Sequence, residues 1–115
     1  MTHSEISAMI GEIGLPYAYY QFPNDTPQVL PFICFIYGES ADLYADNANY
    51  QPITPVQVEL YTVVKDFELE GAVEDVLALH GITWEKDEGF LDSEKMHMTT
   101  YQFEAVITPE GANNG

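Results

Sequence analysis

The clearest structural signal in the sequence is the strict alternation of side chains from Pro55 to Val64. Every second residue from Val56 onward is apolar or a threonine, whereas the residues between them include Gln57 and Glu59. A period of two places these two sets on opposite faces of a β-strand. A shift of register by one residue would bury Glu59, so the sequence specifies strongly which face of this strand meets a core.

Two helices are predicted, one before this strand and one after it. Thr2 and Glu5 have the spacing of a capping box, and apolar residues then recur every three or four positions. The apolar face of this first helix comprises Ile6, Met9, Ile10 and Ile13. The second helix begins near Asp66 with an acidic first turn, which the helix dipole favours. Its apolar face comprises Leu69, Ala72, Val73, Val76 and Leu77. Gly14 and Gly81 are placed to end the two helices in the left-handed conformation.

Four further stretches are predicted to be strands: 17–20, 30–37, 82–85 and 95–107. The run at 30–37 is continuously apolar, which is typical of a strand buried on both faces. An acidic connector, 86–94, would join the last two strands. These elements predict an α+β fold with a mostly antiparallel, four- to five-stranded sheet and two helices packed on one face.

The length of 115 residues fits one domain. We expect a single α+β domain over 1–108 and a disordered C-terminal tail over 109–115, because the last residues are small and polar.

The charge balance excludes several functions. The chain has 19 acidic residues, three lysines and no arginine, for a formal net charge of −16. It cannot assemble the basic contacts that dominate nucleic-acid affinity, and an anionic membrane surface would repel it. The partners that this charge favours are basic protein surfaces, cations or neutral apolar patches.

The single cysteine, Cys34, permits no internal disulfide and stands in an apolar run, which favours a buried inert thiol. The sequence begins without the pattern of a signal peptide, and its longest apolar run is far shorter than the ~20 residues that span a bilayer. We therefore expect a soluble chain that assembles in a reducing cytoplasm.

No group of residues has the spacing of a catalytic, cofactor or metal site. Oxygen ligands gather at 42–49 without the residue order of an EF-hand, so a solvated loop is favoured over a calcium site. The acids of 87–94 are expected to form a charged hairpin tip that discourages edge aggregation. The three histidines lack a second ligand at zinc spacing, and no serine lies in a nucleophile elbow. The sequence therefore predicts no enzyme, no cofactor and no metal.

An aromatic, polar loop between the second and third predicted strands is the candidate interface. Loops this long in small domains are often functional, and exposed tyrosine suits protein interfaces. The candidate interface residues are Leu43, Tyr44, Asp46, Asn47 and Tyr50. In the alternative, Tyr44 and Tyr50 fold back onto the sheet.

Several strings occur in an order that resembles the tail-completion, or tail terminator, proteins of long-tailed bacteriophages (siphophages), which join tail to head. The strings are GLPYAY at 14–19, YADN with a following Tyr at 44–50, QVELYT at 57–62, KDFELE at 65–70, and SEKMH with YQFE at 93–104. The resemblance implies a homo-oligomeric ring, expected to be a hexamer, that caps the tail tube and stops its polymerisation. It implies the tail tube protein and the head-side connector protein as partners. It also implies a place in the tail or neck of the virion after assembly in the host cytoplasm.

In such a ring, acidic side chains that line the central channel would repel passing DNA from the wall. Screening confines this effect to about 8 Å at physiological salt, so only acids at the lumen would act. The candidate lumen acids are Glu39, Asp42, Asp87, Glu88 and Asp92.

Two alternatives remain open on the sequence. One is another neck component of the head-closure type. The other is an acidic adaptor or DNA mimic that binds a basic protein as a monomer or dimer, whereas a ring protein needs two different complementary surfaces on each subunit.

Overall fold

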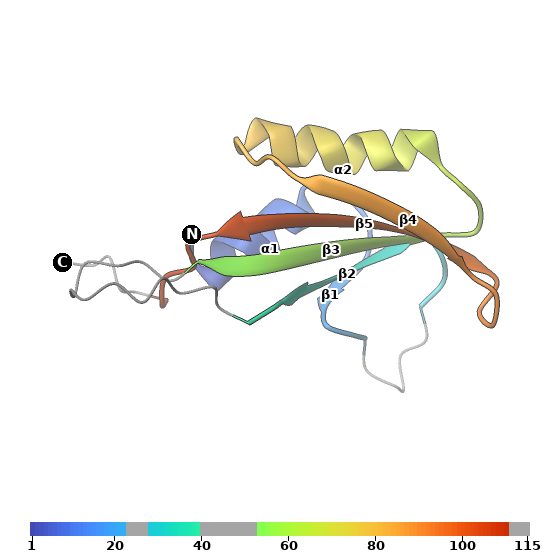
Figure 1. The fold of residues 1–115 in the computed structure, drawn as a ribbon, viewed down its shortest axis with the longest axis horizontal. Coiled ribbons are helices and arrows are strands. Elements are labelled where there is room, and N and C mark those ends of the chain that lie inside the picture. Colours follow the sequence, from blue (N-terminus) through green and yellow to red (C-terminus); the bar gives the residue numbers. More distant parts are fainter. Residues whose placement is uncertain (23–27, 40–52, 111–115) are drawn as a thin grey trace.

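The computed structural model describes residues 1–22, 28–39 and 53–110, which form one five-stranded sheet and two helices (Figure 1). The strand order is β1-β2-β3-β5-β4, and every pairing is antiparallel except that of β1 with β2. The predicted α+β class with a mostly antiparallel sheet is confirmed. The elements are α1 (His3–Gly11), β1 (Tyr17–Tyr19), β2 (Phe32–Tyr37), β3 (Thr54–Thr62), α2 (Phe67–Leu79), β4 (Glu85–Leu91) and β5 (Met96–Ala105).

The core lies on one face of the sheet, beneath both helices. Val58 of β3 is fully buried and stands between Phe35 of β2 and Tyr101 of β5 in the register. The alternation of β3 is therefore the alternation predicted from the sequence, with its apolar set toward the helices. The buried hydrophobic residues of this core are Ile6, Met9, Ile10, Ile33, Phe35, Val56, Val58, Leu60, Val73, Leu77, Tyr101 and Phe103.

Both helices begin and end as the sequence predicts. Thr2 and Glu5 form a reciprocal capping box at α1, and the Asp66 side chain accepts a hydrogen bond from the Leu69 N–H at α2. Gly14 and Gly81 follow the two helices with φ of +92° and +73°, a conformation that glycine adopts without steric cost. The N-terminus is fixed to the last described residues, because the Met1 amino group donates to the Val106 carbonyl at 2.8 Å.

The prediction for residues 82–94 is wrong. We expected a strand at 82–85 and a connector at 86–94, but β4 occupies Glu85–Leu91 and the turn is confined to 92–95. The pairing with β5 satisfies the β4 backbone, and water solvates the charged side chains of this edge strand. The run of charged residues at 85–88 was interpreted as part of a connector because it lacks the apolar alternation of a half-buried strand, which an edge strand does not need.

No helix within the described residues is long and apolar enough to cross a membrane.

Candidate functional site

No helix of the described residues covers the second face of the sheet, here called the open face, which makes it a candidate surface for contact with another molecule. The strand register places its side chains in rows that cross the sheet. One row is Ile36, Gln57, Gln102 and Glu85, and the next is Cys34, Glu59, Thr100 and Asp87. A third row is Phe32, Tyr61, Met98 and Gly89. The open face is therefore polar and acidic toward one end of the strands and apolar toward the other.

A chain of hydrogen bonds fixes the polar side chains at the centre of the open face. Gln102 Nε2 donates to Gln57 Oε1 at 3.1 Å, and Gln57 Nε2 donates to Glu59 Oε2 at 2.6 Å. Tyr61 Oη donates to Glu59 Oε1 at 2.8 Å. Burial and the neighbouring Glu59 carboxylate raise the pKa of Tyr61, so the phenol stays a donor. The Glu59 carboxylate is thus held in place by two neutral donors, the Gln57 amide and the Tyr61 hydroxyl.

A hollow of about 750 Å³ lies at the polar end of the open face. Its lining includes the acids Glu85 and Glu104, the amide residues Gln57 and Gln102, and apolar residues such as Ile36. The β4–β5 register ends at the Glu85–Gln102 pair, and no strand of the described residues pairs with the outer edge of β5 beyond it. This acidic hollow has groups that bind a cationic side chain, namely carboxylates and amide oxygens.

A second hollow, of about 800 Å³, lies at the other end and is mainly apolar. Its lining includes Phe22, Leu30, Phe32, Tyr61, Val63, Leu91 and Met96. Cys34 lines it too and is 6% exposed, and burial together with Glu59 raises the pKa of its thiol to about 11. The expected inert thiol fits this environment, because the thiolate is the reactive form.

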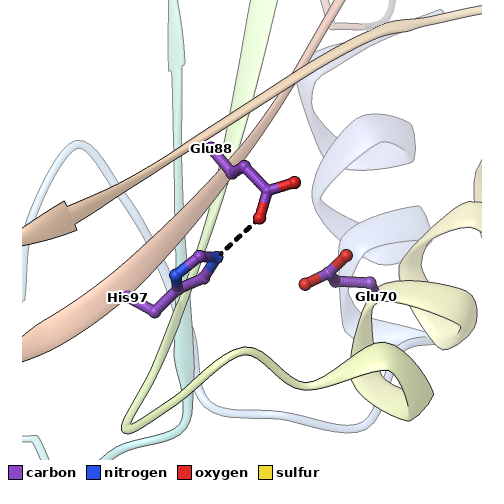
Figure 2. A group of neighbouring side chains, drawn as sticks. All are labelled: Glu70, Glu88 and His97. Atoms are coloured by element: carbon purple, nitrogen blue, oxygen red, sulfur yellow. Dashed lines mark ion pairs between the residues drawn. The ribbon is translucent and has the colours of Figure 1, made fainter.

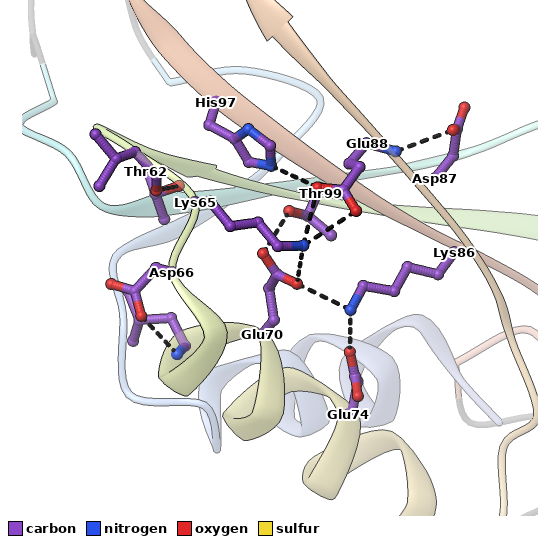
Figure 3. Close-up of polar contacts among 12 residues, drawn as sticks. Thr62, Lys65, Asp66, Glu70, Glu74, Lys86, Asp87, Glu88, His97 and Thr99 are labelled. Carbon is purple, nitrogen blue, oxygen red and sulfur yellow. Dashed lines mark hydrogen bonds and ion pairs between the residues drawn. The ribbon is translucent and has the colours of Figure 1, made fainter.

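A cluster of charges holds β4 against α2 on the helix side of the sheet (Figure 3). Glu70 is 2% exposed, and its Oε1 lies 2.8 Å from the ammonium groups of both Lys65 and Lys86. Thr99 donates a further hydrogen bond to Glu70 Oε2, at 3.2 Å. Burial disfavours the charged form of Glu70, but the hydrogen bonds from Lys65 and Lys86 outweigh burial and lower its pKa. Glu70 is therefore a buried, ionised carboxylate with two cationic partners.

Two neighbours of Glu70 complete a group of potential metal ligands, Glu70, Glu88 and His97, whose ligand atoms lie within 4.8 Å of one another (Figure 2). The Lys65 ammonium already bridges the two carboxylates, at 2.8 Å from Glu70 and 2.9 Å from Glu88. Glu88 Oε1 also lies 3.2 Å from His97 Nε2, without the alignment of a hydrogen bond. Because a lysine stands where a cation would bind, the cluster is best explained as an internal ion-pair network.

The burial of Glu70 was not predicted from the sequence, where this residue is one of the acids of the first turn of α2. The signal was its spacing, because Glu70, Val73 and Leu77 recur at three and four residues and form the buried face of α2. Two of the three lysines of the chain gather on this one carboxylate.

The predicted interface residues lie outside the described residues, as does the predicted lumen acid Asp42. The other four predicted lumen acids are exposed but separate. Glu39 lies just beyond the end of β2, and Asp92 lies in the β4–β5 turn. Asp87 and Glu88 are neighbours on β4, so they face opposite sides of the sheet: Asp87 the open face and Glu88 the ion-pair network. The predicted tail overlaps the described part only at Pro109 and Glu110, and the Glu110 carboxylate accepts a hydrogen bond from the Ser4 hydroxyl.

Comparisons with known proteins inform the fold. No protein-family model and no curated protein matches the chain. Among solved structures, the fold is similar to a chain of the "Virion of native gene transfer agent (GTA) particle", with a TM-score of 0.56 and 14% sequence identity. The match covers 86% of this chain and 83% of that chain. At this identity the likeness shows a shared fold across most of both chains.

Proposed function

We infer that this protein is a non-enzymatic structural component of a phage-like virion, and that it caps the tail tube as a ring, terminates tail polymerisation and joins tail to head. The observation that carries the inference is the fold likeness to a virion chain over 86% of the sequence. The order of sequence strings that resembles tail terminator proteins supports the finer assignment. The two observations are independent, because one depends on backbone geometry and the other on residue identity.

The surfaces of the described residues suit assembly. A closed ring requires each subunit to present two different complementary surfaces. The sheet offers two unlike edges, the short β1 edge with exposed tyrosines and the long acidic β4 edge, together with the open face. The partners under this proposal are further copies of the chain, the tail tube protein and the head-side connector protein.

The net charge of −16 supports a ring through which DNA passes without adhering. Of the described candidates, Glu39 and Asp92 can be replaced without disturbing the ion-pair network or the open face, because Lys65 compensates Glu88 and Asp87 stands on the open face. Replacing both with lysine should slow genome ejection, whereas lysines at Glu68 and Asp75 on the exposed face of α2 provide the matched control. Equal ejection rates for the two variants would remove the lumen role.

Solution mass tests the ring. Light scattering on the isolated protein, and then on its mixture with polymerising tail tube protein, is expected to give either a ring of about six subunits or a monomer that joins a ring at tube ends. A monomer or dimer that ignores tubes and binds a basic protein would favour the acidic adaptor or DNA mimic instead. Binding to the head-side connector without any effect on tube growth would favour a head-closure component.

A further inference from the structure

The open face combines two features that select one kind of partner. Its acidic hollow contains Glu85 and Glu104, and its apolar hollow contains Phe32 and Tyr61. Within the described residues, no lysine forms an ion pair with Glu59, Glu85, Asp87 or Glu104. Lys65 and Lys86 are instead engaged with Glu70 on the helix side. In the part of the chain that the structure describes, the negative charge of the open face is therefore not compensated by a lysine and is available to a binding partner.

We propose that the open face docks a protein surface that presents an arginine or lysine to the acidic hollow and an apolar side chain to the apolar hollow. This inference rests on the proposed function only in taking the partner to be a neighbouring protein of the particle.

The spacing of the two hollows sets a distance for the partner. Gln57 lines the acidic hollow and Tyr61 lines the apolar one, and both belong to β3. Four residues along a strand span about 13 Å, at roughly 3.3 Å per residue. An extended segment that runs along β3 would therefore place its basic and apolar side chains four residues apart.

The charge also argues against the other occupants of this face. A second copy seated face to face would add a second set of carboxylates to an interface where no described lysine pairs with them, and an excess of like charge at an interface is unfavourable. A nucleic acid would meet the carboxylates with its phosphates. A basic protein surface can bind at both hollows. Its guanidinium groups form two parallel hydrogen bonds with carboxylates, and its apolar side chains cover exposed apolar area.

The test uses NMR titration of the whole protein with three synthetic peptides of twelve residues. The probe peptide carries an arginine and a phenylalanine four residues apart in a Gly/Ser background. One twin replaces the arginine with glutamate, and the other replaces the phenylalanine with serine. The probe is expected to shift the amide signals of Gln57, Gln102 and Tyr61, and both twins are expected to bind more weakly.

A matched pair of variants separates local charge from overall charge. Glu85→Gln/Glu104→Gln and Glu68→Gln/Asp75→Asn each remove two exposed carboxylates, the first pair on the open face and the second on α2. The first is expected to weaken probe binding about three- to tenfold, the equivalent of two exposed ion pairs, and the second by less than twofold. Val63→Ser tests the apolar hollow at a side chain that is already 61% exposed, so folding is not at risk.

Three results would overturn the proposal. The first is an equal loss of probe affinity in the two charge variants, and the second is a set of signal changes confined to α2. The third is a shift of open-face signals with protein concentration alone, which would assign the face to a second copy of the chain. Peptide binding does not require ring assembly. If the protein caps tubes but does not bind the probe peptide, this inference is refuted and the proposed function stands. If it binds the probe peptide but does not cap tubes, the proposed function is refuted and this inference stands.

Discussion

Lys86 reaches from the edge strand β4 to Glu70 of α2, and its Nζ lies 2.8 Å from a carboxylate that is 2% exposed (Figure 3). The same ammonium lies 2.7 Å from Glu74, one helical turn further along. An edge strand with little apolar burial is in this way fixed to a helix by charge. The ion pair of Lys86 with Glu70 therefore joins β4, whose bounds were not predicted from the sequence, to a buried acid whose burial was not predicted either.

Lys86→Met is expected to lower the free energy of unfolding by about 1–2 kcal/mol, because Glu70 stays buried with only Lys65 as cationic partner. The loss is smaller than the roughly 3–5 kcal/mol of a fully buried pair, since water reaches the Lys86 side chain. Urea unfolding measures the change, and Lys95→Met, in the exposed β4–β5 turn, is the charge-matched control. Equal effects at the two positions would show that the network contributes nothing specific.

Lowering the pH is expected to reduce the free energy of unfolding, because Glu70 becomes protonated. Its pKa is lowered in the folded state, because the lysine hydrogen bonds outweigh burial. The stabilisation is therefore fully present above the ordinary glutamate value of about 4.3 and is lost as the pH falls through the lowered folded pKa. Unfolding free energies measured from pH 7 to pH 3 should show the wild type losing stability relative to Glu70→Gln below about pH 4.3. The comparison of the wild type with Glu70→Gln cancels the contribution of the other carboxylates. Parallel curves of unfolding free energy against pH would contradict the lowered pKa of Glu70.

Tyr101→Phe is expected to cost about 1–2 kcal/mol of stability. The Tyr101 ring is fully buried, and its hydroxyl donates to Glu74 Oε2 at 2.9 Å. Burial and the Glu74 carboxylate raise the Tyr101 pKa, so the hydroxyl remains a donor. Tyr20→Phe is the control, because Tyr20 is 66% exposed and should tolerate the change within a few tenths of a kcal/mol. Thermal unfolding of both variants measures the difference.

Asp66→Ala is expected to destabilise the protein by about 1 kcal/mol, since it removes the acceptor of the Leu69 N–H at the start of α2. Asp66→Asn keeps an oxygen at the cap and should restore most of the loss. If Asn and Ala prove equally destabilising by denaturant unfolding, the cap hydrogen bond is not the source of the effect.

The sequence predicted those parts of the fold that depend on local pattern. The alternation of β3, the caps at Thr2 and Asp66 and the left-handed residues Gly14 and Gly81 each have a local physical cause. It did not predict β4, because pairing with β5 stabilises that strand and no pattern of its own marks it. The burial of Glu70 was missed for a related reason, since the lysines that compensate it lie five residues before it and 16 residues after it in the chain.

The open face could be predicted only in part. The polar set of β3 was identified as facing away from the core, but the rows that group Gln57 with Glu85, and Tyr61 with Phe32, depend on strand order. Strand order follows from long-range pairing, which the pattern of a single strand does not encode. The loop interface proposed at 43–50 stays a prediction.

Electron microscopy of tail tubes polymerised with and without this protein tests the central claim most directly. The account predicts that tubes grown with the protein stop at a narrower and shorter range of lengths and carry a ring at one end. Tubes of unchanged length without a terminal ring, at protein concentrations in excess of tube ends, would contradict the account.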